Sequence, residues 1–454
     1  MSMHKDIAES DTGLVTPEGR AAWDRMVLAF LAHSAETPIH LGAVLEHEPD
    51  AALPLAAKGL FCQLLGRSEM AEAAQAAALA ARKAVSQGGA PERARGWTDA
   101  LLAWQKGSPG GAIFHLESLL AVNPADTMTM KLSHAIRFVM GDAVGMRRST
   151  GRALPAHGPD HALTGYALGC HAFALEETGD YVGAERSGLL GLDYAADDAW
   201  GLHAVAHVYD MTHRPGPGIS LIEDNLSAWS HCNNFRFHVW WHKALLHLDR
   251  GELDVALDLY DAKIRDEKTD DYRDISNATS LLVRLELEGM DVGARWHELA
   301  ELSEARVGDG CLVFADLHYM LALTGDNRPD AAQNLAARIA ASSSGATEVA
   351  RLNAHPGQVA AAGLADFGEG RYSDAFAKLA STRAHMRTIG GSHAQRDVFE
   401  RITVDAGLRA GQYAAVEAIL ADRTALRAGK DDAFAASRNA QIAAAKRDAL
   451  YAAQ

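Results

Sequence analysis

Two pairs of histidines with a spacing of four residues stand out in the centre of the chain. His203 and His207 enclose the sequence AVA, and His238 and His242 enclose VWW. Residues four apart lie on one face of an α-helix, and two imidazoles at this spacing can bind one zinc ion. Four imidazoles would converge if the two helices were neighbours. A zinc site is therefore one alternative, although neither pair contains the glutamate of an HExxH motif.

The same histidines have two further interpretations. A neutral histidine buried between helices needs only one hydrogen-bond acceptor, and the neighbouring Trp240 and Trp241 favour such packing. Imidazoles that face a groove can instead bind a polar substrate or transfer a proton, because their pKa lies near neutrality. Core packing, ligand binding or catalysis, and metal binding all remain open at this point.

Two later segments also combine histidine with other polar residues. In FADLH, Asp316 and His318 are two positions apart, so they lie on different faces of a helix and would need a third group to interact. A Ser-His-Asp hydrolase has little support, because no GxSxG turn is present. Phosphate-binding glycine loops are absent as well.

The segment GGSHAQRD is a Gly-Gly turn that leads into a helix. Ser392 at the helix start and Gln395 three positions later fit a capping box, which explains both without a function. The capping box does not explain His393, Arg396 and Asp397 in the same turn. An arginine at a helix start opposes the helix dipole, which favours an ion pair or an anionic ligand there.

Composition and charge narrow the possible classes of protein. The chain has 454 residues with 48% hydrophobic residues, 22% charged residues and a net charge of −16. This acidity argues against a general binder of nucleic acid or anionic membranes, both of which favour Lys and Arg clusters. Four widely spaced cysteines suit a reducing compartment, and no apolar run approaches the roughly 20 residues of a membrane span. We expect a cytoplasmic protein.

A recurring glycine predicts the scaffold that positions these residues. It follows an apolar helical segment, and an alanine or another apolar residue lies five positions later. Such a glycine can end a helix in the left-handed conformation, and the small residue lets the next helix approach closely. The glycines are Gly107, Gly141, Gly179, Gly251, Gly370 and Gly411.

Successive glycines are 34, 38, 72, 119 and 41 residues apart. Three spacings suit one two-helix repeat of about 34–45 residues, and the other two suit two and three repeats. The sequence LEETGDYVGAERSGLLGLDYAADD looks like a degenerate tetratricopeptide repeat (TPR). We therefore predict an all-α fold, a TPR-like right-handed α-α superhelix (solenoid) curled around a central concave pocket. A plain helical bundle with glycine caps is the alternative.

The solenoid is predicted as one domain over residues 17–424. Residues 1–16 are expected to form a loose arm, residues 425–454 a capping helix, and Ser342–Gln358 a long loop. In this repeat register the first helix of each pair lines the concave side. The paired histidines then face a groove. Glu177 of the preceding repeat either reaches this groove or lies at a solvated helix end.

Several separated motifs, in this order, together resemble the tetratricopeptide repeat protein 38 family. They are DAWGLHAVAHVYDM, FHVWWHKALLHLDRGELDVALDLYD, SLLVRLELEGMDVGARW, FADLHYMLAL and IGGSHAQRDVF. The resemblance covers at least residues 164–411 and departs at the HRPGPG turn. It implies a TPR-like α-superhelix in a cytosolic protein and carries no established activity. The motif positions are Glu177, Trp200, His203, His207, Trp229, His238, Trp241, His242, Arg284, Arg295, Trp296, Asp316, His318, Ser392, His393, Gln395, Arg396 and Asp397.

Taken together, these residues predict a concave pocket that binds a small polar or anionic ligand. Its catalytic candidates, for a His/Asp-assisted hydrolysis or transfer, are His207, His242, Asp316, His318 and His393. Its binding candidates are Glu177, Trp200, His203, Trp229, His238, Trp241, Arg284, Ser392, Gln395, Arg396 and Asp397. We expect no cofactor, no nucleic acid and no membrane as partners, and whether the protein is an enzyme stays open. The alternatives are an adaptor with a peptide or protein in its groove, and zinc at His203, His207, His238 and His242.

Overall fold

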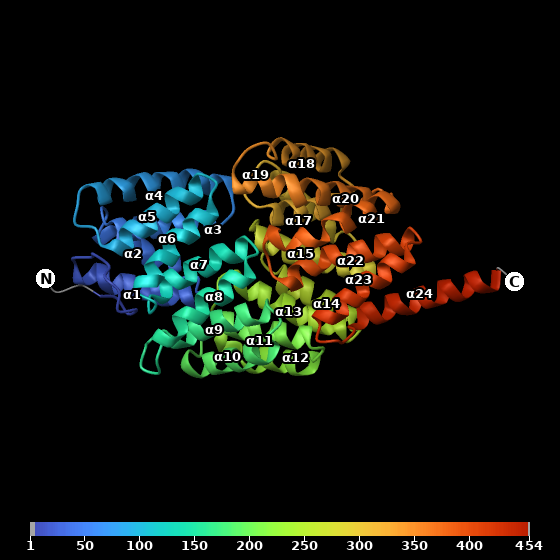
Figure 1. Ribbon diagram of the computed structural model, residues 1–454, viewed down its shortest axis with the longest axis horizontal. Coiled ribbons are helices and arrows are strands. Elements are labelled where there is room, and N and C mark those ends of the chain that lie inside the picture. The colour runs from blue at the N-terminus through green and yellow to red at the C-terminus, as the bar shows by residue number, and fades with distance from the viewer. Residues whose placement is uncertain (1–4, 453–454) are drawn as a thin grey trace. The chain divides into compact units, whose positions relative to one another are not determined.

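The computed structural model describes residues 5–452, and this part of the chain is built from helices (Figure 1). It contains no β-strand, only isolated bridges between Lys5 and Asp11 and between Ser34 and Cys232. Consecutive helices pack against each other as pairs, for example α3 with α4, α5 with α6 and α9 with α10. The predicted all-α, TPR-like fold is therefore confirmed. None of the described helices combines the length and apolar character that a membrane span requires.

The chain forms two compact units where the sequence predicted a single domain. The first unit consists of the residues up to Val205 together with 225–236 and 345–351. Its helices are α1 (Pro17–Leu31), α2 (Thr37–His47), α3 (Ala52–Leu64), α4 (Ser68–Ser86), α5 (Glu92–Gln105), α6 (Pro109–Val122), α7 (Thr127–Val139), α8 (Ala143–Ala153), η1 (Leu154–Ala156), α9 (Thr164–Glu176), α10 (Tyr181–Tyr194), the start of α11 (Ala199–Met211), η2 (Leu226–Ala228) and most of α19 (Glu348–Leu352).

The second unit consists of residues 206–224, 237–344 and 352–454. It holds the end of α11, then α12 (Pro215–Asp224), most of α13 (Phe235–Asp249), α14 (Leu253–Leu259), η3 (Tyr260–Ile264), α15 (Tyr272–Leu287), α16 (Arg295–Ala305), α17 (Val313–Gly325), α18 (Pro329–Ala341), η4 (Asn353–Gly357), α20 (Gln358–Gly368), α21 (Tyr372–Thr382), η5 (Arg383–Ile389), α22 (His393–Arg409), α23 (Tyr413–Leu426) and α24 (Ala433–Ala452).

All six predicted turn glycines adopt the left-handed conformation. Their φ angles lie between 65° for Gly141 and 82° for Gly179. Each joins the two helices of a pair, as Gly251 joins α13 to α14 and Gly411 joins α22 to α23. The close approach of paired helices is also present, because a Cβ placed on Gly407 of α22 would lie 2.5 Å from Val416 of α23.

The two long gaps between the six glycines contain three further turns. Two of them carry a residue other than glycine, whereas Gly289, with Ala294 five positions later, fits the glycine pattern. His213 (φ 52°), Gly289 (φ 86°) and Asn327 (φ 51°) hold the same left-handed position between paired helices. Asparagine tolerates this conformation well and histidine less so, and the His213 ring is held by Asp249 Oδ2 at 2.7 Å from Nδ1. From Gly179 to Gly370 the turns follow at intervals of 34, 38, 38, 38 and 43 residues, so the array is continuous along the sequence.

Two segments are more ordered than the sequence suggested. Residues 5–16 of the expected loose arm pack into the first unit, where Ala8 and Leu14 are fully buried; residues 1–4 lie outside the described part. The expected loop 342–358 contains α19 and the π-helical turn η4. Both segments lack the helical apolar periodicity on which the prediction relied.

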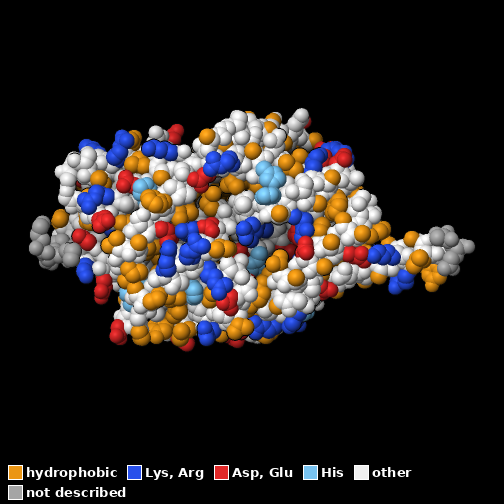
Figure 2. Space-filling model, in the orientation of Figure 1, with side chains coloured by type: hydrophobic (Ala, Val, Ile, Leu, Met, Phe, Trp, Pro, Cys, Tyr) orange, Lys and Arg blue, Asp and Glu red, His pale blue; other side chains and the backbone are white. Residues whose placement is uncertain are grey.

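The C-terminal segment contains α24, which begins at Ala433. Phe434, Ala435 and Ile442 of α24 are buried in the second unit, whereas Leu450 and Tyr451 are exposed. The last turns of α24 extend away from the other helices of this unit (Figure 1) and carry exposed basic side chains (Figure 2). Only the first part of α24 therefore contributes to the core.

Candidate functional site

Four of the predicted histidines lie together in the second unit. His207 comes from α11, His238 and His242 from α13, and His393 is the first residue of α22. The ring centroid of His242 lies 4.3 Å from that of His207 and 4.6 Å from that of His238. The ring of His393 lies 5.0 Å from that of His207. Three helices thus bring together imidazoles that are up to 186 positions apart in the sequence.

Hydrogen bonds orient two of these rings. Asn277 of α15 accepts a hydrogen bond from His238 Nδ1 through Oδ1, at 3.0 Å. His238 Nδ1 therefore carries the proton, and its Nε2 presents a lone pair. That lone pair faces His242 Nε2 at 3.1 Å, so His242 donates from Nε2 while both rings are neutral.

Burial keeps the imidazoles of His238 and His242 neutral at pH 7. His207, His238 and His242 are each at most 9% exposed. Burial lowers the pKa of His238 to about 4, although its bond to Asn277 acts in the opposite direction. Burial, followed by the neighbouring His207 and His238, lowers the pKa of His242 well below its ordinary value. His238 and His242 therefore offer nitrogen lone pairs rather than positive charge.

The Gly-Gly turn before α22 has the capping box that the sequence predicted. Ser392 Oγ accepts a hydrogen bond from the Gln395 backbone N–H at 3.2 Å, and Gln395 Oε1 accepts one from the Ser392 N–H at 3.0 Å. Gly391 has a φ of 73°, and a Cβ there would lie 2.4 Å from the Phe314 ring. Arg396 donates to the carbonyls of Gly390 and Gly391. These contacts fix the turn and thereby place His393.

The two polar residues of FADLH point in different directions. Asp316 forms an ion pair with Arg338 of α18, and burial raises its pKa to about 6. His318 Nδ1 donates to the Phe314 carbonyl at 2.8 Å, and its ring packs on Phe399. Their opposite orientation follows from a two-residue offset on one helix. The structure does not join Asp316 to the imidazole cluster, and His318 lies in an aromatic environment where burial lowers its pKa to about 3.

Four other candidates belong to the first unit, namely Glu177, Trp200, His203 and Trp229. Trp200 and His203 pack among aromatic rings, with centroid distances of 4.6 Å from Trp200 to Phe173 and 5.3 Å from His203 to Phe235. Lys131 Nζ lies 4.4 Å from the centroid of Trp200, an attractive contact between a cation and a ring. Among other candidates in this unit, Glu177 caps the end of α9 and Trp229 is 1% exposed.

Asp198, just before α11 in the first unit, is a buried carboxyl that no sequence pattern marked. It is 1% exposed, and within the described residues its Oδ2 has no hydrogen-bond partner. Burial raises its pKa to about 7, although Lys131 and the backbone N–H groups of Gly201 and Trp200 act in the opposite direction. The charged form therefore destabilises the folded state at neutral pH.

We predict that Asp198→Asn stabilises the protein at pH 8. A folded-state pKa above the unfolded value gives stability that is present below about pH 4 and is lost as pH rises through about 7. Asparagine keeps the helix cap and remains neutral, so the gain at pH 8 should be up to about 4 kcal/mol and should vanish near pH 4. Urea unfolding at both pH values measures this difference, and a loss of stability at pH 8 would contradict it.

Arg284 of α15 is the most unusual charged residue of the second unit. It is 1% exposed and donates to two backbone carbonyls, those of Ser280 at 3.0 Å and Ala394 at 2.6 Å. Its closest carboxylate oxygen is Asp397 Oδ2 at 3.9 Å, and Asp397 already binds Arg401 and Arg423 at 2.6 and 2.9 Å. Burial, followed by the charge of Arg401, lowers the pKa of Arg284 to about 9.

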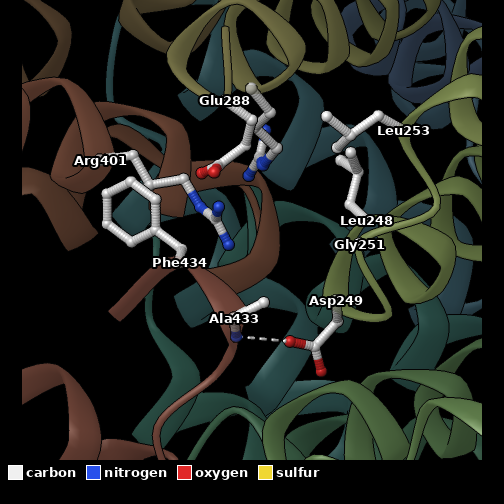
Figure 3. A pocket seen from close by; sticks show the side chains of 9 residues that line it. Leu248, Asp249, Gly251, Leu253, Glu288, Arg401, Ala433 and Phe434 are labelled. Atoms are coloured by element: carbon white, nitrogen blue, oxygen red, sulfur yellow. Dashed lines mark hydrogen bonds between the residues drawn. The ribbon is translucent and has the colours of Figure 1, made fainter. Parts of the chain in front are cut away.

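A cavity of about 120 Å³ lies against Arg284. Figure 3 shows Arg401, Phe434 and Glu288 on one side of it, and Asp249, Leu248 and Leu253 on the other. Both acids already have partners in the protein. Glu288 forms an ion pair with Arg438 at 2.6 Å, and Asp249 accepts a hydrogen bond from the Ala433 N–H at 3.0 Å. The sequence pattern did not identify this cavity, and of its lining residues only Arg284 was a binding candidate. The lining residues are Leu248, Asp249, Gly251, Leu253, Arg284, Glu288, Arg401, Ala433 and Phe434.

Comparison with known proteins finds two remote structural likenesses. No family model matches the chain. The human IFIT1 dimer with m7Gppp-AAAA is similar at 12% identity, over 82% of this chain and 86% of that chain, with a TM-score of 0.40. The Naa15/Naa10 structure bound to HypK-THB is similar at 14% identity, over 94% of this chain and 65% of that chain, with a TM-score of 0.25. Likenesses this remote transfer neither ligand nor chemistry.

Proposed function

We propose that the second unit binds a small anionic ligand in the cavity beside Arg284. The observation that carries this proposal is a guanidinium that is 1% exposed, borders a cavity and has no carboxylate closer than 3.9 Å among the described residues. A buried charge is costly unless a counter-charge and hydrogen bonds compensate it. A carboxylate or phosphate in the cavity would supply both.

The other walls restrict the size and charge of the ligand. Arg401 adds a second guanidinium, whereas Asp249 and Glu288 would repel a second anionic group. Leu248, Leu253 and Phe434 offer apolar surface. A ligand with one compact anionic head and a short apolar body fits these walls best.

The proposal is for binding rather than for catalysis. The side chains that line the cavity include two arginines and two engaged carboxylates, and none is an imidazole, hydroxyl or thiol. A nucleophile or a general base must lie within hydrogen-bond reach of the reacting group. His/Asp-assisted hydrolysis or transfer, with His207, His242 or His393 as the base, would need a substrate that reaches beyond these walls.

We also propose membership of the tetratricopeptide repeat protein 38 family and a cytoplasmic location. Several separated motifs, from DAWGLHAVAHVYDM to IGGSHAQRDVF, occur in the order found in the family and support membership of it. None of the four cysteines forms a disulfide, which supports a reducing compartment.

We predict that Arg284→Met weakens anion binding. Calorimetric titration of the wild-type protein with butyrate and with inorganic phosphate should detect saturable binding of at least one of them. Arg284→Met should weaken it by about tenfold or more, because a charge-assisted hydrogen bond contributes about 1.5–3 kcal/mol.

Arg273→Met is the matched control for this experiment. Arg273 lies on the same helix, and both of its side-chain hydrogen bonds to Asp271 are local. The Arg273→Met protein should bind the anion with the affinity of the wild-type protein. Equal weakening by both substitutions, or saturable binding that Arg284→Met leaves unchanged, would refute the proposed site.

A further inference from the structure

Three imidazoles of the second unit have the arrangement of a metal site. His207 from α11 and His238 and His242 from α13 each offer a ring nitrogen, and these nitrogens lie within 4.8 Å of one another. The cavity beside Arg284 has none of them in its lining. The imidazole cluster is therefore a separate feature from the proposed anion site.

The distance between two of the nitrogens matches that between ligands of one ion. His238 Nε2 and His242 Nε2 are 3.1 Å apart. Two ligands of tetrahedral zinc, each about 2.0–2.1 Å from the metal, are about 3.3 Å apart. Replacing the single shared proton by a metal ion would lengthen this N–N distance by only a few tenths of an ångström, and both rings would turn so that their lone pairs point at the metal.

Asn277 gives His238 the orientation that metal-binding histidines usually have. Its Oδ1 accepts the proton of His238 Nδ1 at 3.0 Å. A ligating histidine commonly donates its other N–H to an oxygen acceptor, which fixes both the tautomer and the direction of the lone pair. The His238 lone pair is thereby directed at His242.

We propose that His207, His238 and His242 bind one divalent transition-metal ion, with zinc as the best match. Nitrogen ligands favour zinc and its neighbours over magnesium or calcium, which prefer oxygen. Three imidazoles leave one tetrahedral position for water or another ligand. The ring of His393, 5.0 Å from that of His207, lies beside the site.

The test is metal content rather than activity. Untagged protein is incubated with excess zinc, desalted and analysed by mass spectrometry of the elements, and a cobalt-loaded sample is examined for the visible absorption of tetrahedral cobalt. We expect one tightly held ion per chain and a tetrahedral cobalt spectrum. Less than about one ion per ten chains in the wild-type protein would overturn the proposal.

Two variants and a control test whether the ion is bound at this site. His242→Gln should lose the ion, whereas His297→Gln should retain it, because His297 lies on α16 with a side chain that is 64% exposed. Asn277→Leu provides a second variant if His242→Gln does not fold, and it should weaken zinc binding by about 10- to 100-fold. An ion that both His242→Gln and Asn277→Leu retain at wild-type affinity is bound elsewhere, and this result would also overturn the proposal.

Discussion

Asp432→Asn is expected to destabilise the protein by about 3 kcal/mol or more. Asp432 lies just before α24, and its side chain is 3% exposed. It accepts two hydrogen bonds from Arg423, both at 2.6 Å, and one from Arg401 at 3.0 Å. Although burial alone would raise it, Arg423 and Arg401 hold the pKa of Asp432 below its usual range.

Asparagine isolates the effect of the charge. Asp432 Oδ1 also accepts from the Ala435 N–H at 2.9 Å, and an asparagine oxygen preserves this helix cap. What the substitution removes is one of the carboxylates that compensate the buried guanidinium of Arg423 and the partly buried one of Arg401. Breaking a buried ion pair leaves a charge without its partner, which costs far more than losing an exposed pair.

Urea unfolding of the wild-type and variant proteins measures this prediction. Asp422→Asn is the control, because Asp422 is 67% exposed and its contact with Arg383 is 3.4 Å long. It should change the free energy of unfolding by less than about 1 kcal/mol. An Asp432→Asn protein within that same range would show that the ion network does not stabilise the second unit.

Arg93→Met should cause a comparable loss in the first unit, about 3–5 kcal/mol at pH 7. Arg93 is 6% exposed and bridges Asp6 Oδ2 at 2.6 Å and Asp126 Oδ1 at 2.8 Å. Its guanidinium lies 5.0 Å from the centroid of Trp97. Methionine fills part of the space but leaves two buried carboxylates without a cation.

The loss should depend on pH in a definite direction. In the wild-type protein Arg93 and the Trp23 N–H hold the pKa of Asp6 below 3.8, although burial acts to raise it. A lowered folded-state pKa gives stability that is present above about pH 4 and is lost as pH falls through the folded pKa. Without Arg93, burial raises the pKa of Asp6, so the destabilisation should be largest at pH 7 and smaller near pH 4.

Unfolding of wild type and Arg93→Met at pH 7 and pH 4.5 checks this prediction. Arg95→Met serves as the control, since Arg95 lies on the same helix, is exposed and donates only to the Ala90 carbonyl among its described hydrogen bonds. A loss for Arg93→Met that is equal at both pH values would contradict the electrostatic explanation.

The fold could be predicted because its signals are local. A left-handed glycine such as Gly179 or Gly411 is required by the turn itself, so it can be recognised from neighbouring residues alone. His213 and Asn327 fill the same turn position with other residues, and the glycine pattern missed them. The capping box of Ser392 and Gln395 was visible for the same reason, since its two partners are three residues apart.

The sites were only partly predictable because their partners are distant in sequence. The four-residue spacing placed His238 and His242 on one helix face, and the structure adds His207 and His393 beside them. The carboxylates that neutralise the buried arginines lie up to 87 residues away, as for Arg93 and Asp6. Arg284 was marked only by the family resemblance, since its burial results from the packing of several helices.

The central claim is that an anion binds in the cavity beside Arg284, and blocking that cavity tests it most directly. Leu253→Trp places an indole against the cavity wall without changing any charge, and Val255→Trp, at a position that is 40% exposed on the same helix, is the matched control. In calorimetric titrations with the anion that the wild-type protein binds, Leu253→Trp should weaken binding by about tenfold or more, and Val255→Trp should leave it unchanged. Wild-type affinity in Leu253→Trp would contradict the account.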